Sequence, residues 1–523
     1  MRSAAKRMSL TVCPLLLLLL STAGYVQGQT LPTFQHIVIV FQENRTPDNL
    51  FGSGGKGATS GCGVEDPFEP GVDIQNGGQA KGIGVICFTP RAINDSCDPG
   101  HFHSDFENMW DSDHLDGCSA QSTCPTNGCY SAVPLPDVQP YFDIATNYGF
   151  ANYMFQTNEG PSFQAHQFIF SGTSGPIGTP PTMYYNYFGE NNPPNAYLNN
   201  TGCSGGDNSL DSVPGIDPNG QTHNPWYIPP GLTFSYPCYT HNTLIELLEQ
   251  PIPKITWKYY APGENSIWTA PTAFSNICGG IDKHPCPNFH GTGKYVNNLI
   301  LESTNHLTPV FTDIVNCNLA QVSWVIPDGK WSDHPGLTTK AGPGYVANLV
   351  DLIGNSNCKD SNGQTYWQDT AIFIAWDDWG GWFDHVNPNH APGLGVKVNC
   401  PDWGCGYTYG FRVPLLVVSA YTKAGYVSGD TRTVGETQKY VHDFGSVLAF
   451  MENNFLGSGK IGKINQQYPF ADAFAPDSIG GNIPLSDFFD TANYRPFTPI
   501  DPTTAYPLSY FMNMQGNPEG PDD

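Results

Sequence analysis

Residues 36–52 constrain the fold of this chain more than any other stretch. His36–Phe41 reads His-Ile-Val-Ile-Val-Phe, an almost unbroken apolar and β-branched run. Such a run predicts a strand that is buried on both faces, as in a parallel sheet. Glu43 and Asn44 follow directly, and Pro47 prevents the strand from continuing. Polar residues beyond the C-terminal end of a buried strand lie where open α/β sheets bind their ligands.

Two interpretations of these polar residues remain open at this point. The carboxylate of Glu43 and the amide of Asn44 both offer oxygens, which are the ligands that hard divalent cations prefer. In the second interpretation, Asn44 or Asp48 caps the N-terminus of a helix.

Composition and charge exclude several classes of protein. Aromatic residues make up 13% of the 523 residues and charged residues also 13%, which excludes a disordered chain. The formal net charge of −25 disfavours binding to nucleic acid or to an anionic membrane surface. The same charge repels phosphate, so a phosphate site here requires a metal ion or local cationic groups.

The first 28 residues have the features of a secretory signal peptide. Arg2, Lys6 and Arg7 precede the apolar run Leu15–Leu20, and Gly28 is a small residue at a plausible cleavage site. No other apolar run is long enough to span a bilayer, so we expect an exported protein without stable membrane insertion.

The cysteines predict disulfides. Without Cys13 an even number remains, and in an exported chain disulfides are the default state. The close pairs Cys278/Cys286 and Cys400/Cys405 are expected bridges, whereas the rest of the connectivity stays open. The Gly-rich stretch 53–96, with two cysteines, is predicted to be a disulfide-pinned loop insertion.

Further apolar runs alternate with helical stretches. Strands are expected in Lys254–Tyr260, Gln321–Pro327, Ala371–Trp376 and Phe411–Ser419, and helices in Pro140–Met154, Phe163–Phe170 and Gly344–Gly354. This order predicts an α/β sandwich with a mostly parallel sheet. After about residue 460 the chain reads as a Pro- and Asp-rich tail.

Two motifs resemble those of the phosphoesterase family, which holds bacterial and plant phospholipases C and an acid phosphatase branch. The first is Glu43-Asn44-Arg45 with Asp48 and Phe51-Gly52, and the second is Asp377-Asp378-Trp379-Gly380-Gly381-Trp382-Phe383-Asp384-His385-Val386. The similar blocks span residues 34–457. The resemblance implies an alkaline-phosphatase-like α/β/α sandwich, with residues 29–523 as a single catalytic domain.

The second motif has its own physical argument for a metal. Asp377 and Asp378 end a strand side by side, where their charges repel each other unless a cation is present. The resemblance implies that one divalent ion is held by Glu43, Asn44, Ser162, Asp377 and Asp378. An all-oxygen set favours calcium, magnesium or manganese.

Ser162 is the candidate nucleophile. Gly160-Pro161 forces a turn, so Ser162 lies at the N-terminus of the helix that follows. It is either a plain helix cap or a nucleophile whose phosphoryl adduct faces backbone N–H groups. The resemblance implies the nucleophile.

Histidines complete the predicted site. By resemblance, His101 contacts the phosphate, with His103 as its rival, and His334 contacts the phosphate and donates a proton to the leaving oxygen. Asp384 and His385 are expected to brace the loop rather than to bind the metal.

The resemblance implies a secreted, metal-dependent hydrolase of phosphate esters that resembles the acid phosphatases. A phospholipase C acting on phosphodiesters is the alternative, so the partner is a phosphate-ester small molecule or a phospholipid headgroup. Trp379 stands where the family has a histidine, which leaves open a catalytically inactive secreted binding protein on the same fold. The oligomeric state is not predicted.

Overall fold

The fold is known from a computed structural model, which describes part of the chain. The described residues are 31, 33–54, 62, 70–118, 123–174, 188–189, 191–192, 202–204, 215–216, 222–223, 238–239, 241–264, 266–280, 286–301, 308–388, 407–433, 438–457 and 475–513. The predicted signal peptide and the expected Cys400/Cys405 bridge lie outside these residues.

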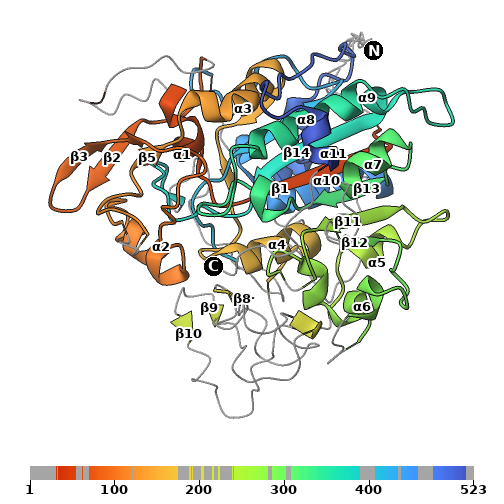
Figure 1. Cartoon of the computed structure of the whole chain (residues 1–523), viewed down its shortest axis with the longest axis horizontal. Helices are drawn as coiled ribbons and strands as arrows, with labels where there is room; N and C mark the ends of the chain where they lie inside the picture. Colours follow the sequence, from red (N-terminus) through yellow and green to blue (C-terminus); the bar gives the residue numbers. More distant parts are fainter. Residues whose placement is uncertain are drawn as a thin grey trace, which may run out of the picture.

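An eight-stranded sheet forms the centre of the molecule (Figure 1). Its strands, in spatial order, are β12 (Leu299–Leu301), β11 (Trp257–Ala261), β13 (Val322–Val325), β1 (His36–Gln42), β14 (Thr370–Trp376), β15 (Leu415–Ser419), β6 (Gly149–Ala151) and β16 (Tyr426–Ser428). All neighbouring pairs are parallel except the two that β15 makes with β14 and β6. The predicted mostly parallel sheet is confirmed.

The predicted buried strand at 36–41 is β1, which lies between β13 and β14. Its side chains from Ile37 to Phe41 are fully buried, which explains the unbroken apolar run. Gln42 at the end of β1 pairs with Trp376 at the end of β14. Glu43 and Asp377, which follow these two strands, therefore begin side by side at the same edge of the sheet.

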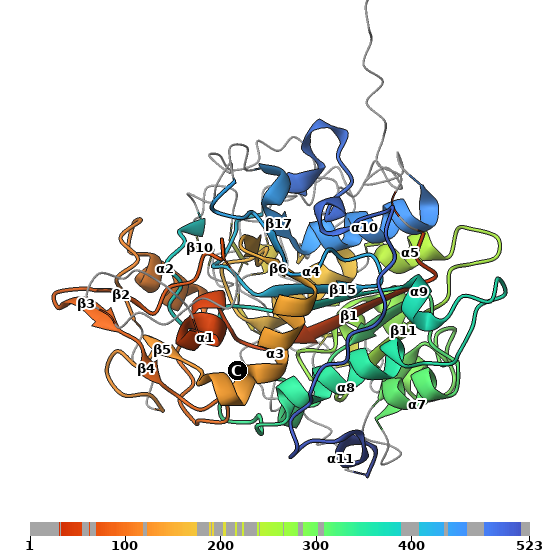
Figure 2. The same cartoon turned by 90° about the horizontal axis from the view of Figure 1, so that it is seen from above.

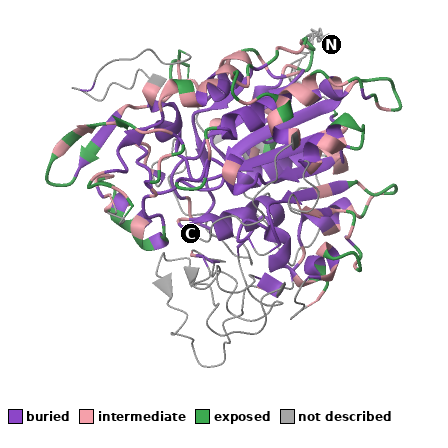
Figure 3. Cartoon of the chain, viewed as in Figure 1, coloured by how far each residue is buried: buried purple, intermediate pink, exposed green. Residues whose placement is uncertain are grey.

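Helices cover both faces of the sheet (Figure 2). One side carries α3 (Leu135–Asn147), α7 (Pro309–Val315) and α8 (Gly342–Gly354), and the other carries α4 (Ser162–Ser171), α5 (Leu244–Leu248) and α10 (Phe444–Leu456). The strands between these layers are buried almost throughout (Figure 3). The arrangement confirms the expected α/β/α sandwich.

The helix expected at 140–154 was placed wrongly. The observed α3 begins at Leu135 and ends at Asn147. Gly149–Ala151 instead forms β6, which pairs with β15 on one side and β16 on the other. Pairing with strands that are distant in sequence overrides the local helical pattern here.

Long connections gather beside α1 (Pro47–Phe51), which follows β1 (Figure 1). They contain the hairpin of β2 (Gly77–Ala80) and β3 (Gly84–Cys87), α2 (His103–Trp110), and the pair β4 (Thr89–Pro90) and β5 (Ser131–Ala132). Smaller elements elsewhere are β7 (Met154–Phe155), β8 (Phe188–Gly189), β9 (Gly215–Ile216), β10 (Thr222–His223), α6 (Ser275–Cys278), α9 (Tyr366–Asp369), β17 (His442–Asp443) and α11 (Leu508–Asn513).

Disulfides pin these connections, as the cysteine count predicts. The described bridges are Cys62–Cys87, Cys97–Cys124, Cys118–Cys129, Cys203–Cys238, Cys278–Cys286 and Cys317–Cys358. The expected Cys278–Cys286 bridge is confirmed. Cys62–Cys87 confirms the disulfide expected within residues 53–96, but the described part of this stretch contains β2, β3 and β4 and is not a loop throughout.

The prediction of a tail after residue 460 is wrong for residues 475–513. Phe488 and Phe511 of this segment are fully buried. The ring of Phe511 packs against those of Phe311, Trp331 and Tyr345, with centroids 5.4 to 6.0 Å away. The Pro- and Asp-rich composition gave no indication that these aromatic residues are buried. Their burial makes the segment part of the core.

The segment also carries buried polar contacts. His442 lies between Asp477 and Ser428, with ring nitrogens 2.8 Å from Asp477 Oδ2 and 2.8 Å from Ser428 Oγ. Although these residue types resemble a hydrolytic triad, all three are buried and Ser428 also donates to Asp487. The arrangement therefore holds the C-terminal segment against β16 and β17.

Among the described residues, no helix combines the length and the apolar character that crossing a bilayer requires.

We expect Phe511→Ala to lower the free energy of unfolding by about 3–5 kcal/mol, because it removes a fully buried aromatic side chain. Tyr494→Ala is the matched control in the same segment, since Tyr494 is 50% exposed, and should cost about 1 kcal/mol or less. Denaturant titration of both variants measures the difference. Equal, small effects would mean that the segment does not contribute to the core.

Candidate active site

The ends of β1 and β14 bring two predicted pairs of residues together. Glu43 and Asn44 follow β1, and Asp377 and Asp378 follow β14. The Asn44 backbone N–H donates to Asp377 Oδ1 at 2.8 Å. Asn44 has φ = +57°, a left-handed conformation that asparagine tolerates better than most residues. The sharp turn there joins the two pairs at one edge of the sheet.

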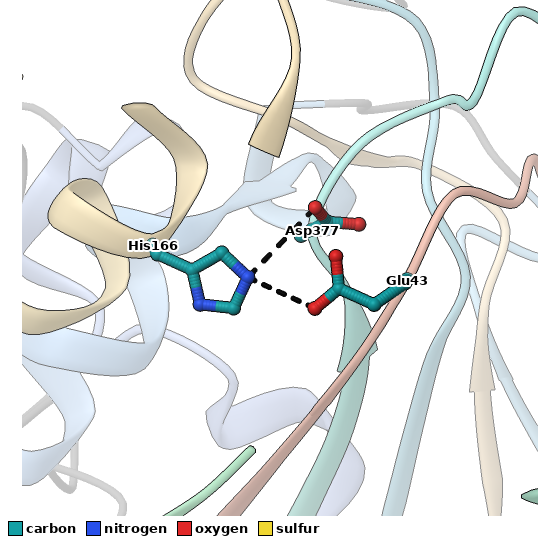
Figure 4. Close-up of side chains that lie close together, drawn as sticks. All are labelled: Glu43, His166 and Asp377. Carbon is teal, nitrogen blue, oxygen red and sulfur yellow. Dashed lines mark hydrogen bonds and ion pairs between the residues drawn. The ribbon is translucent and has the colours of Figure 1, made fainter. Parts of the chain in front are cut away.

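His166 of α4 completes a buried cluster with two of these carboxylates (Figure 4). Its Nε2 lies 2.9 Å from Glu43 Oε1 and 3.8 Å from Asp377 Oδ2. His166 is not among the site residues predicted above. A signal for it existed, because His166 follows Ser162 by four residues, and residues at that spacing share a helix face.

Ser162 is the first residue of α4 and is fully buried. Its hydroxyl donates to Asp378 Oδ2 at 3.1 Å, and Asp378 Oδ1 accepts from the Gly380 N–H at 2.6 Å. Pro161 occupies the N-cap position, so Ser162 is not the N-cap residue of α4. The plain-cap interpretation of Ser162 is therefore wrong, and its hydroxyl lies against a predicted metal ligand instead.

The capping interpretation of Asn44 and Asp48 is wrong as well. The N-cap of α1 is Thr46, whose side chain accepts from the Asn49 N–H. Asp48 accepts from the backbone N–H of Gln75 at 2.9 Å and from that of His385, also at 2.9 Å. The side chain of Asn44 faces His101.

His101, and not its rival His103, lies beside Asn44. Its Nδ1–H donates to the Pro99 carbonyl at 2.9 Å, which leaves Nε2 as an acceptor for the Asn44 amide at 3.1 Å. His103 lies 3.6 Å from a carboxylate oxygen of Glu159. Burial lowers the pKa of His103 to about 4.

His334 follows β13 and reaches the same edge of the sheet. Its ring packs against Trp268, with centroids 5.7 Å apart, and Trp268 stacks on His166 at 6.5 Å. Trp268 therefore connects the two histidines, a role that the sequence analysis missed because residues 261–296 show no readable pattern.

Arg45 fixes the loop that carries His334. Its Nε and Nη2 donate to the Asp333 carbonyl at 3.1 and 2.7 Å, and its guanidinium lies over the Trp382 ring at 5.4 Å. The buried positive charge of Arg45 thus contacts neighbouring segments, because its hydrogen bonds go to the carbonyls of Asp333 and Ile93 and to the Asn49 side chain.

The residues at this edge fit a divalent cation. The side chains of Glu43, Asp377 and Asp378 are buried side by side. Asn44 Oδ1 and Asp377 Oδ2 are buried without a hydrogen-bond partner among the described residues. Unpaired buried oxygens and crowded carboxylates are costly, and a cation bound by oxygen ligands removes both costs.

A second acidic cluster is neutralised by the protein itself. Arg412 donates to Asp384 Oδ1 at 2.8 Å and Oδ2 at 3.0 Å, and it reaches Asp48 at 3.3 Å. His385 lies 2.7 Å from Asp48 and 3.0 Å from Asp73. Asp384 and His385 thus lie in this network and not in the Glu43–His166–Asp377 cluster.

The His385 network predicts a pH-dependent stability. Burial disfavours the protonated ring, but the bonds to Asp48 and Asp73 outweigh it and raise the pKa of His385 from 6.5 to about 10. A raised pKa stabilises the folded state fully below pH 6.5, and this stabilisation is lost as the pH rises towards 10. The stability advantage of the wild type over His385→Asn should therefore shrink steadily across that range in denaturant titrations.

Asp73→Asn removes one of the two carboxylates that raise the pKa of His385. In this variant the stabilisation by protonated His385 should therefore be lost at a lower pH than in the wild type. A constant difference between the wild type and His385→Asn at every pH would contradict the assignment of a protonated His385.

Comparison with known proteins agrees with this geometry. A profile of the Phosphoesterase family matches residues 34–456. The non-hemolytic phospholipase C of Pseudomonas aeruginosa is 24% identical over 444 residues, which are 80% of this chain and 54% of that protein. The non-hemolytic phospholipase C of Burkholderia pseudomallei is 32% identical over 156 residues, 27% of this chain and 20% of that protein.

Phospholipase C B of Mycobacterium tuberculosis is 31% identical over 140 residues, 25% of this chain and 26% of that protein. The chain thus spans about half the length of the Pseudomonas relative, and the matches to the other two are shorter. The family profile covers most of the chain, including both motifs and all the strand ends that form the site. The chain belongs to the Phosphoesterase family.

Proposed function

We propose that this protein hydrolyses phosphate esters, with one divalent metal ion and Ser162 as the nucleophile. One observation carries the proposal. The Ser162 hydroxyl bonds to Asp378 beside the buried cluster of Glu43, His166 and Asp377. The C-terminal edge of the sheet thus brings together the Ser162 hydroxyl, the buried carboxylates and the N-terminus of the ten-residue helix α4.

Each residue has a proposed role. Glu43, Asn44, Asp377 and Asp378 hold the metal, together with Ser162. When bound, the ion supplies positive charge that lowers the pKa of the serine hydroxyl and neutralises phosphate oxygens. Asp378 orients the Ser162 hydroxyl through their hydrogen bond.

The histidines act on the substrate. His101, whose ring is oriented by Pro99 and Asn44, contacts the phosphoryl group. His334, held by Trp268 and by its bond to the Pro335 carbonyl, donates a proton to the leaving oxygen. Calcium, magnesium and manganese are the proposed metals, since the five proposed side-chain ligands, Ser162 included, all bind through oxygen.

The substrate class has two candidates. Gly160-Pro161-Ser162 and the paired aspartates favour the phosphomonoesters of an acid phosphatase. The names of the relatives favour a phospholipase C acting on phosphodiesters. We further propose that the protein is exported, because disulfides are typical of oxidising compartments.

A panel of a phosphomonoester, a phosphodiester and phosphatidylcholine, each assayed with and without a chelator, tests the activity. We expect hydrolysis of at least one ester, and its loss after chelation. Cleavage of the monoester alone would select the phosphatase, and cleavage of phosphatidylcholine would select the phospholipase C. An inactive protein that still binds phosphate would support the binding-protein alternative.

The two aspartates that flank β14 provide a matched pair of variants to test the metal assignment. Asp377→Asn, just after β14, should lose the bound metal and nearly all turnover. Asp369 is a buried aspartate that directly precedes the other end of β14. The variant Asp369→Asn should therefore keep both the bound metal and the turnover. Metal content after dialysis, measured by mass spectrometry, gives a readout besides activity. Full metal content in Asp377→Asn would refute the assignment.

We expect Ser162 to form a phosphoenzyme. Attack by Ser162 and then by water makes two in-line displacements, so a chiral labelled phosphate ester should be hydrolysed with retention of configuration. Ser162→Ala should abolish the phosphoenzyme and lower kcat by at least about a thousandfold. Ser171→Ala, at the other end of α4, is the control and should keep wild-type turnover. Inversion at phosphorus would make water the direct nucleophile.

A further inference from the structure

Asn192 bonds to the backbone of the residue that follows the candidate nucleophile. Its side-chain Oδ1 accepts a hydrogen bond of 3.0 Å from the backbone N–H of Phe163, the residue that follows Ser162. The first N–H group after the nucleophile is therefore bonded to a side chain. The sequence analysis assigned no role to this residue, because it lies in a Pro-, Asn- and Gly-rich stretch.

This bond fixes the orientation of the Asn192 amide. A backbone N–H requires an acceptor, so the atom that contacts Phe163 is the amide oxygen and the other terminal atom of the side chain is the NH₂ donor. Asn192 is only 4% exposed, and its Nδ2 has no hydrogen-bond partner among the described residues. A buried NH₂ donor without a partner is costly unless a ligand supplies the acceptor.

Neighbouring contacts hold Asn192 in place. The carbonyl of Asn191 accepts from the Gln164 side chain, and Asn191 Oδ1 accepts from the His103 N–H at 2.9 Å. Asn191 and Asn192 thus connect the first turn of α2 to the first turn of α4. The two helices that begin beside His101 and Ser162 position the free NH₂ group.

We propose, on the basis of the proposed function, that Asn192 is a phosphoryl-binding residue. Its NH₂ group donates a hydrogen bond to a non-bridging oxygen of the phosphoryl group at Ser162. A deprotonated phosphoryl oxygen only accepts hydrogen bonds, which matches a donor that has no partner among the described residues. A neutral donor also suits a site crowded with carboxylates, because it binds the anion without forming an ion pair with them.

Asn192→Asp separates this role from a purely structural one. The aspartate keeps an acceptor for the Phe163 N–H and is as good a partner for a helix N-terminus as asparagine. It removes the NH₂ donor and places a negative charge towards the phosphate. Asn191→Asp is the matched control, since it adds the same charge one residue away and keeps an acceptor for the His103 N–H.

The experiment measures the inhibition constant of inorganic phosphate, kcat/KM and the melting temperature for the wild type and both variants. Asn192→Asp should bind phosphate on the order of 10- to 100-fold more weakly, with a similar loss in kcat/KM and an unchanged melting temperature. Asn191→Asp should resemble the wild type in all three.

The outcomes distinguish the two proposals. Wild-type phosphate binding in Asn192→Asp would overturn the role of Asn192 and leave the proposed function intact. An equal loss in Asn191→Asp would also overturn it, because added charge alone would then explain the effect. A wild type that neither hydrolyses esters nor binds phosphate would overturn the proposed function and this inference with it.

Discussion

The in-register pairing of β1 with β14 is the constraint on which the site depends. Gln42 and Trp376 are partners at the ends of these strands, so the next residues, Glu43 and Asp377, leave the sheet together. The bond from the Asn44 N–H to Asp377 then locks the two turns. A slip of one residue would turn the side chains of the shifted strand to the opposite faces and separate these groups.

The protein contains two buried acidic clusters and treats them differently. Arg412 and His385 neutralise Asp48, Asp73 and Asp384 with bonds of 2.7 to 3.3 Å. The cluster at Glu43 and Asp377 has a histidine, but Asp377 Oδ2 and the adjacent Asn44 Oδ1 have no hydrogen-bond partner among the described residues. The cluster around Arg412 and His385 connects loops to one another, whereas the cluster at Glu43 and Asp377 has the donor set of a cation site. The two clusters therefore differ in whether the protein's own cationic groups neutralise the carboxylates.

The sequence predicted the strands and the strand ends well, because apolar runs and abrupt polar stops are local signals. The predictions from sequence failed where contacts between distant segments determine the local structure. Residues 149–151 became a strand through pairing with β15 and β16, and the segment with Phe511 joined the core through its aromatic partners. Trp268 and Asn192 escaped detection because their contacts join segments that are distant in sequence. For His166 the spacing from Ser162 was visible, but its contact with Glu43 was not.

By itself, the sequence determined that buried strands end in carboxylates, amides and histidines, and that a serine begins a helix after a Gly-Pro turn. These features follow from residue type and spacing, which act over a few residues. Only the tertiary structure decided which strand ends are neighbours, that Ser162 bonds to Asp378, and that His101 rather than His103 meets Asn44. Such contacts depend on strand order and register, which are fixed by packing across the whole chain.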